Sequence, residues 1–378
     1  MSSWTATSPS RETFMARAVE LAYRGRGATA PNPCVGAVLV RDGEVAAEGW
    51  HQRYGGPHAE RECLADARAK GIDPRGMTMY VTLEPCNHTG KTPPCTDALI
   101  EAGVAEVVVG AMDPNPVAAG GAARLARHGV TVTTGVLEQE CLDLTADFRL
   151  WQDTHSPFNI LKMAATLDGK IASRFRRPEA VSCPESFARV QELRARVGAV
   201  VVGGGTFLAD NPSLTCRLDP LPDGFVQPYA VIVASRLPER PEQFALLRDR
   251  PERTVFLTTL DSARSPLADH LRERGTSVWP LPGSPGCLNL ATGFERLRYD
   301  LGCHYTLIEG GGRLALHCLA QGLADEILHF VAPRVLGDDQ APAAYAGRSA
   351  APMSETMDLR IIRTERSGTD LLLTMRPD

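Results

Sequence analysis

Residues 58–60 read His-Ala-Glu, and residues 85–95 read Pro-Cys-Asn-His-Thr-Gly-Lys-Thr-Pro-Pro-Cys. One histidine and two cysteines have the nitrogen and thiolate groups that bind zinc, and three protein ligands leave the fourth tetrahedral position open for water, as in catalytic sites. Zinc lowers the pKa of its bound water towards about 7. The glutamate, two residues after the histidine, can carry a proton from this water to a leaving amine. The two runs therefore predict a zinc-dependent deaminase.

The spacing of the two candidate cysteine ligands needs an explanation. Eight residues separate Cys86 from Cys95, whereas nucleobase deaminases usually have two in between. The longer loop can bulge outward if a helix begins at Cys95, and the preceding prolines favour a helix start. The alternative is two buried cysteines with a surface histidine. It is disfavoured because His-Ala-Glu at a helix start and Thr-Leu-Glu-Pro-Cys after a strand occur together, as a zinc site requires. We predict His58, Cys86 and Cys95 as zinc ligands and Glu60 as the catalytic acid and base.

Length and composition indicate a globular protein with two domains. The chain has 378 residues, of which 43% are hydrophobic and 22% are charged. A net charge of -5 argues against a nucleic-acid surface, and no apolar run approaches the ~20 residues that span a bilayer. The first residues do not resemble a signal peptide, and the ten cysteines are scattered without a disulfide-framework pattern. We expect a cytoplasmic protein with reduced thiols.

Strands and helices alternate through the first predicted domain, residues 1–151. The run at residues 35–50 predicts a β-hairpin with an Asp-Gly turn. The alternation predicts an α/β/α sandwich. The other predicted strands cover residues 77–83, 106–111 and 130–134, and the predicted helices cover residues 11–26, 57–70, 95–102, 119–128 and 138–151.

The second predicted domain, residues 157–378, has two glycine-rich turns. An apolar run at residues 199–202 leads into three glycines, and residues 305–309 lead into three more. A glycine turn after a buried parallel strand lets a phosphate approach backbone N-H groups. Neither turn has the G-x-G-x-x-G fingerprint. Two such turns in one sheet nevertheless favour a dinucleotide-binding crevice over simple tight turns.

The chain resembles the bifunctional deaminase/reductase family of riboflavin biosynthesis. The resemblance is carried by residues 30–36, 57–60 and 82–95, with the long loop that ends in Thr-Pro-Pro-Cys, and extends through residues 162–170 and 203–217. It implies a cytidine-deaminase-like N-terminal domain and a dihydrofolate-reductase-like α/β C-terminal domain that binds NADPH. It also implies hydrolytic deamination of a phosphoribosylated diaminopyrimidine, followed by reduction of its ribosyl group to ribityl.

The same resemblance implies binding roles for particular residues. Asn32 would contact the sugar of the substrate; the alternative is that it is only a turn residue. His51 would face the substrate; the alternative is a solvated side chain. Lys162 could contact substrate, or simply end a strand. The residues implied to hold NADPH are Ala164, Thr206, Asp210, Gly311, Gly312 and Arg313. The residues implied to hold the ribose-phosphate are Arg194, Leu214, Arg217 and Glu309, of which the two arginines suit a phosphate but could also be solvated.

Two positions depart from the family pattern. Pro178 stands where the family has a serine that meets the substrate phosphate, and Ala180 stands where it has a tryptophan that meets the cofactor. The arginines of residues 174–177 could replace the phosphate contact, or the reductase could be lost. A deaminase whose second domain binds without reducing is therefore the first alternative. No proton donor for the reduction can be named from the sequence.

Two further alternatives belong to other functional classes. A nucleic-acid deaminase would use the same zinc chemistry, but the chain has no dense basic tract and the second domain would be unexplained. A zinc-stabilised regulator without catalysis would normally fill all four zinc positions with protein ligands. We expect a small phosphoribosyl pyrimidine as substrate and no nucleic-acid or membrane partner. We also expect a homo-oligomer, although the apolar strand near residues 327–335 could equally be interior.

Overall fold

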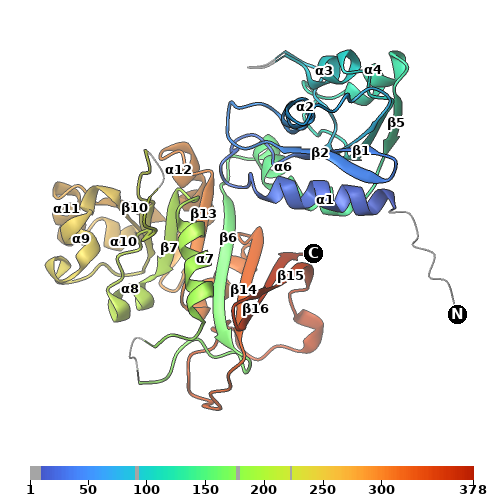
Figure 1. Cartoon of the computed structure of the whole chain (residues 1–378). Helices are drawn as coiled ribbons and strands as arrows, with labels where there is room; N and C mark the ends of the chain where they lie inside the picture. Colours follow the sequence, from blue (N-terminus) through green and yellow to red (C-terminus); the bar gives the residue numbers. More distant parts are fainter. Residues whose placement is uncertain (1–9, 90–92, 176–178, 222–223) are drawn as a thin grey trace, which may run out of the picture. The chain divides into compact units, whose positions relative to one another are not determined.

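The computed structural model describes residues 10–89, 93–175, 179–221 and 224–378 (Figure 1). The chain divides into two compact units, Met1–Thr154 and His155–Asp378. Pro178 lies outside the described residues, whereas Ala180 lies within them. In the described ranges no helix combines the length and the apolar character needed to cross a membrane.

Unit 1 is a five-stranded sheet with helices on both faces. Its elements are α1 (Arg11–Tyr23), β1 (Gly36–Arg41), β2 (Glu44–Trp50), α2 (Ala59–Ala69), β3 (Thr78–Leu83), α3 (Cys95–Glu101), β4 (Glu106–Ala111), α4 (Gly121–Arg127), β5 (Thr131–Thr134), α5 (Glu138–Leu144) and α6 (Ala146–Asp153). The strand order is β2-β1-β3-β4-β5, with β1 antiparallel to both its neighbours and β3, β4 and β5 parallel. Helices α2, α3 and α4 pack on one face of the sheet, and α1 and α5 pack on the other. The predicted α/β/α sandwich is present.

Local structure in unit 1 follows the sequence predictions with one exception. The turn between β1 and β2 has positive φ at Asp42 (51°) and Gly43 (77°), the backbone that an Asp-Gly hairpin turn requires. The single helix predicted for residues 138–151 is wrong, because the structure breaks it into α5 and α6 at Thr145. Thr145 has φ of -104° and ψ of 15°, outside the helical region, and both its backbone N-H and its hydroxyl donate to the carbonyl of Cys141, at 3.3 and 3.1 Å.

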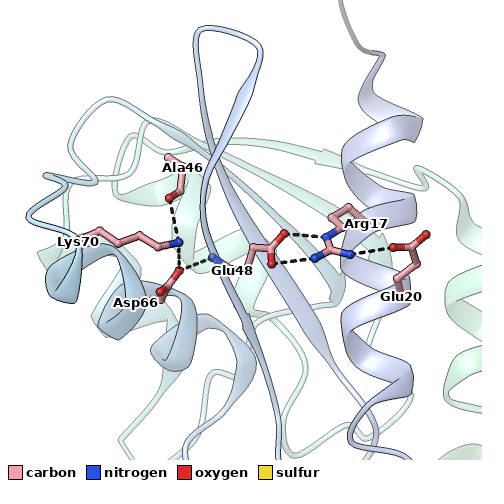
Figure 2. A network of polar contacts seen from close by, with 6 residues as sticks. All are labelled: Arg17, Glu20, Ala46, Glu48, Asp66 and Lys70. Atoms are coloured by element: carbon pink, nitrogen blue, oxygen red, sulfur yellow. Dashed lines mark hydrogen bonds and ion pairs between the residues drawn. The ribbon is translucent and has the colours of Figure 1, made fainter.

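A polar network fixes α2 against β2 (Figure 2). Arg17 of α1 donates to both carboxylate oxygens of Glu48, at 2.7 and 3.0 Å. The backbone N-H of Glu48 donates to Asp66 Oδ2 at 2.9 Å, and Lys70 Nζ donates to the same oxygen at 2.7 Å. Next to Glu48, a Cβ on Gly49 would lie 2.2 Å from a backbone nitrogen of α2. The helix that follows His58 therefore lies directly on the strand.

Unit 2 is built on a nine-stranded sheet in the order β10-β9-β8-β7-β13-β6-β14-β16-β15. Its strands are β6 (Phe158–Thr166), β7 (Ala199–Gly203), β8 (Tyr229–Val233), β9 (Thr254–Thr259), β10 (Ser277–Leu281), β13 (Tyr305–Glu309), β14 (Glu326–Ala332), β15 (Leu359–Ser367) and β16 (Asp370–Pro377), beside the small pair β11 (Gly283–Ser284) and β12 (Cys287–Leu288). Its helices are α7 (Pro184–Arg194), α8 (Gly204–Asp210), α9 (Ala245–Asp249), α10 (Leu260–Ala263), α11 (Pro266–Glu273), α12 (Ala291–Tyr299) and α13 (Gly312–Ala320), with short turns η1 (Pro241–Gln243), η2 (Pro251–Arg253) and η3 (Met353–Glu355).

The sheet of unit 2 is parallel from β10 to β14 and antiparallel at β16 and β15. Strand β14 lies between β6 and β16. The part of the apolar run up to Ala332 therefore forms an interior strand with no free edge for a second subunit, whereas Val335 lies beyond the strand and is exposed.

A buried polar group lies at the amino ends of β6 and β13. The backbone N-H of Asn159 donates to Asp325 Oδ2 at 2.7 Å, and the Thr306 hydroxyl donates to Asn159 Oδ1 at 2.6 Å. Burial raises the pKa of Asp325 to about 6, and the hydrogen bond from Asn159 offsets only part of that effect. The folded chain therefore holds a proton on Asp325 at a pH where the unfolded chain has lost it.

Replacing Asp325 by Asn is expected to weaken the pH dependence of the free energy of unfolding between about pH 4 and about pH 7. The pKa of Asp325 rises from 3.8 to about 6 on folding, so its contribution to stability is complete below the lower value and is lost as pH rises through the upper one. The shift corresponds to about 3 kcal/mol. Denaturant titrations of both proteins from about pH 4 to about pH 7 measure it. A pH-independent difference in unfolding free energy between them would contradict this prediction.

Candidate functional site

Three elements of unit 1 bring the predicted zinc ligands together. His58 directly precedes α2, Cys86 follows β3, and Cys95 is the first residue of α3. His58 Nδ1 lies 3.6 Å from Cys86 Sγ and 3.4 Å from Cys95 Sγ, and the three ligand atoms lie within 4.8 Å of one another. Ligands about 2.1–2.3 Å from a tetrahedral zinc would be roughly 3.5–3.8 Å apart. The set therefore fits zinc.

The start of α3 stabilises negative charge on Cys86. The backbone N-H of Cys95 donates to Cys86 Sγ at 3.3 Å. Hydrogen bonds from the Cys95 side chain and then from His58 lower the pKa of the Cys86 thiol, and burial opposes them. The backbone and the hydroxyl of Thr96 both donate to the Cys86 carbonyl at 3.4 Å. The arrangement favours the thiolate, which is the form that binds metal.

Glu60 lies in the first turn of α2, with only 3% of its surface exposed. Burial raises the pKa of its carboxyl group above the usual range, and the charge of His58 acts in the opposite direction. A carboxyl group whose pKa is shifted towards neutrality is suited to accepting and returning a proton near neutral pH. Its place on the same helix turn as His58 matches the predicted role.

His51 and Asn32 lie together near His58. The ring of His51 is 5.4 Å from that of His58, and His51 is 2% exposed, so the solvated alternative for this residue is wrong. His51 Nδ1 lies 2.8 Å from the carbonyl oxygen of Pro57, so Nδ1 carries the hydrogen and Nε2 is left as an acceptor, 3.4 Å from Asn32 Nδ2. Burial lowers the pKa of His51, which favours this neutral form. Contact of either residue with substrate stays a prediction.

Sequence reasoning missed Glu84, which organises the loop before α4. Its buried carboxylate accepts from the backbone N-H groups of Gly120 at 3.1 Å and Ala122 at 3.0 Å. Between them, a Cβ on Gly121 would lie 1.8 Å from the Pro85 carbonyl oxygen, so only glycine fits. A glutamate beside Pro-Cys and a pair of glycines were visible in the sequence, but no local signal indicated that they would meet.

A cavity of about 1730 Å³ lies at the carboxyl ends of β6, β7 and β13 in unit 2. It exceeds the ~300–1,000 Å³ of most small-molecule pockets, which suits a dinucleotide. Strands β7, β13 and β6 are adjacent (Figure 1), so the glycine turns after β7 and β13 line the same space. The predicted NADPH residues that line this cavity are Ala164, Thr206, Asp210, Gly311, Gly312 and Arg313.

The two glycine turns approach each other at Thr206. Gly310 and Gly311 have φ of 88° and 51°, in the left-handed region that favours glycine. A Cβ on Gly310 would lie 3.1 Å from Thr206 Oγ1, and one on Gly311 would lie 3.4 Å from it. The positive φ at both positions disfavours other residues where the turns meet, and glycine leaves the backbone open to a phosphate.

The residues predicted to hold the ribose-phosphate do not line the described cavity. Arg194 donates to both carboxylate oxygens of Glu309, at 2.7 and 2.8 Å, and to the carbonyl of Thr215 at 2.9 Å. Leu214 is buried with a φ of 49°, and Arg217 is exposed. Arg194, Glu309 and the segment near Thr215 are thus together. A phosphate would have to share the Arg194 guanidinium with Glu309.

Lys162 connects these residues with the cavity. It lines the cavity, and burial lowers the pKa of its ammonium group while the charge of Glu309 opposes that effect. Lys162 is the middle residue of β6 and lines the cavity, so the alternative that it simply ends a strand is wrong. Its contact with substrate stays a prediction.

Two serines in the cavity lining were also missed. The hydroxyls of Ser173 and Ser182 are buried and have no hydrogen-bond partner among the residues that the structure describes. In the sequence they flank Ala180, whose carbonyl accepts from Arg334 Nη1 at 3.1 Å. An unpaired buried hydroxyl costs about 1–3 kcal/mol, which a bound ligand can relieve. Serine is too common for the sequence alone to have indicated this.

Two family models match the chain. The model described as the cytidine and deoxycytidylate deaminase zinc-binding region matches residues 8–111, and the RibD C-terminal domain matches residues 157–373. The two family models agree with the zinc-ligand set of unit 1 and the cavity of unit 2. Together they define a bifunctional enzyme, a zinc-dependent deaminase joined to an NADPH-dependent reductase.

Relatives match over nearly the whole chain. Riboflavin biosynthesis protein RibD of Actinobacillus pleuropneumoniae is 36% identical over 362 residues, covering 95% of this chain and 93% of the relative, and that of Escherichia coli (strain K12) is 38% identical over 348 residues, covering 87% and 89%. The chain belongs to the riboflavin biosynthesis protein RibD family.

Solved structures agree with this assignment. Acinetobacter baumannii RibD, form 1, has a TM-score of 0.71 at 33% identity and covers 97% of this chain and 98% of its own. A diaminohydroxyphosphoribosylaminopyrimidine deaminase/5-amino-6-(5-phosphoribosylamino)uracil reductase from Thermotoga maritima has a TM-score of 0.70 at 37% identity, with the same coverage. The predicted family and fold class, a deaminase-like domain followed by a reductase-like domain, are confirmed.

Proposed function

We propose that unit 1 deaminates a phosphoribosylated diaminopyrimidine and that unit 2 reduces the ribosyl group of the product to ribityl. The name of the Thermotoga maritima protein supplies this substrate class. The observation that carries the proposal is the buried carboxyl group of Glu60 on the same helix turn as a ligand set that fits zinc.

In the first step, His58, Cys86 and Cys95 would hold the metal. Zinc, when bound, supplies an activated water as the nucleophile. Glu60 takes the proton of that water and gives it to the departing amine, so ammonia leaves and a carbonyl replaces the amino group. The acceptor nitrogen of His51 and the side-chain amide of Asn32 are proposed to orient the substrate.

In the second step, the glycine turns of unit 2 would receive the cofactor. NADPH, when bound, supplies the hydride. Backbone N-H groups near Gly311 bind its phosphates, and Thr206 and Arg313, which both line the cavity, contact it. We propose that Lys162 and Arg194 neutralise the substrate phosphate, with Leu214, Arg217 and Glu309 completing that subsite. Lys162 lines the cavity and is paired with Glu309 on the neighbouring strand, which supports this division.

Three further expectations are part of the same proposal. The protein would be cytoplasmic, would act on a small molecule without a nucleic-acid partner, and would form a homo-oligomer. Light scattering of the purified full-length chain measures its mass in solution. A monomer at micromolar concentration would contradict the oligomer.

The proposed function is tested by following ammonia and NADPH together. Zinc-loaded protein supplied with the phosphoribosylated diaminopyrimidine is expected to release ammonia first and then to oxidise one NADPH for each ammonia. Ammonia release without NADPH oxidation would favour a deaminase whose second unit only binds, in line with the altered segment at Ala180. Absence of both reactions would overturn the proposal.

A further inference from the structure

The loop between Cys86 and Cys95 must hold two metal ligands although eight residues separate them. An eight-residue loop has many accessible conformations. Fixing its two ends at the spacing of metal ligands therefore costs conformational entropy. The described residues on both sides of the loop show what restrains it. At each end, an arginine from a different helix binds groups next to a cysteine ligand.

Arg61 holds the end of the loop that precedes Cys95. Its Nη2 donates to the carbonyl oxygens of Pro93 at 3.0 Å and Pro94 at 3.1 Å. These are the two residues before Cys95, so the guanidinium fixes the start of α3. Arg61 is also three residues after His58 on α2, which is itself fixed to β2 (Figure 2). One side chain thus links the histidine-bearing helix to the second cysteine ligand.

Arg124 holds the end that follows Cys86. From α4, its Nη1 donates to Asn87 Oδ1 at 3.0 Å, and its Nη2 pairs with Asp97 Oδ1 in α3 at 2.5 Å. Asn87 is the residue directly after Cys86, and Asp97 is two residues after Cys95. One planar guanidinium therefore joins both borders of the loop, which suits arginine because its donors have fixed directions.

We propose that Arg61 and Arg124 are positioning residues of the metal site, which hold Cys86 and Cys95 at the spacing of tetrahedral ligands. This rests on the proposed zinc chemistry of unit 1. Neither arginine binds the metal or the reacting atoms. Residues that orient metal ligands from outside typically change metal affinity about 10- to 100-fold when they are substituted.

The test measures zinc affinity of the full-length chain by competition with a chromophoric chelator. Arg61→Met and Arg124→Met keep the alkyl stem but remove the donors, and each is expected to weaken zinc binding by about 10- to 100-fold. Arg61→Lys, which retains the charge and can donate to one carbonyl, is expected to lie between Arg61→Met and the unmodified protein. The rate of zinc loss to excess chelator should rise in the same order.

Matched controls come from exposed arginines of the same helices. Arg68→Met on α2 and Arg127→Met on α4 are expected to leave zinc affinity unchanged, because Arg68 is exposed near the far end of α2 and Arg127 donates within its own helix. Equal affinities of Arg61→Met, Arg124→Met and the controls would overturn the inference. Failure of the unmodified protein to bind zinc would instead overturn the proposed function. If one methionine variant does not fold, Arg61→Lys and the other variant still decide the matter.

Discussion

Replacement of Glu60 by Gln is expected to lower kcat for ammonia release by about 10²- to 10⁴-fold. Glutamine has nearly the same size and can occupy the same buried place, but it cannot take a proton from water and return it to the leaving amine. Initial rates of ammonia release at saturating substrate measure this loss. Because the carboxyl group of Glu60 is buried and is not one of the three predicted ligands, zinc content should stay at the level of the unmodified protein.

Two measurements separate this loss from general damage. NADPH oxidation with the deaminated substrate should proceed at the unmodified rate, because the described cavity lies in unit 2. Metal analysis should show a full zinc complement. A Glu60→Gln protein that retains zinc and deaminates at the original rate would show that another group moves the proton.

Removal of zinc with a chelator is expected to reduce ammonia release to less than ~1% of its starting rate, because the water would lose its activation. Readdition of zinc should restore the rate. The reduction step, measured by NADPH oxidation with the deaminated substrate, should be unaffected, since the three predicted ligands belong to unit 1.

Cys86→Ser is the matched variant for this experiment. It removes the thiolate that the start of α3 stabilises, so added zinc should restore the unmodified protein but not the variant. Deamination that persists in metal-free protein would contradict the zinc mechanism. Loss of the reduction step together with deamination would show that zinc supports the structure of the whole chain.

The zinc ligands could be predicted from sequence because their chemistry and their local structure agree. His58 and Cys95 each lie at the start of a helix, and Cys86 follows a buried strand, so the periodic pattern and the residue types indicate the same arrangement. The glycine turns were predictable for the same reason. Each follows an apolar run that becomes a parallel strand.

Contacts between distant elements could not be predicted in this way. Nothing near Arg61 indicates that it will bind two proline carbonyls, and nothing near Arg194 indicates that two of its nitrogens will donate to Glu309. Charged side chains are mostly solvated, so their sequence context carries little information about partners. The break at Thr145 was missed because it is a change of backbone conformation at one residue, which leaves no trace in the periodic pattern.

The predicted zinc ligands and Glu60 all come from residues 58–95, whereas the described lining of the cavity comes from residues 162–357. Each reaction is thus encoded by its own stretch of the gene. Mutations in one stretch can accumulate under selection on one step without altering the groups that perform the other. A substitution near Ala180, in the second stretch, can therefore change how a cofactor is held without altering the groups of the hydrolytic site.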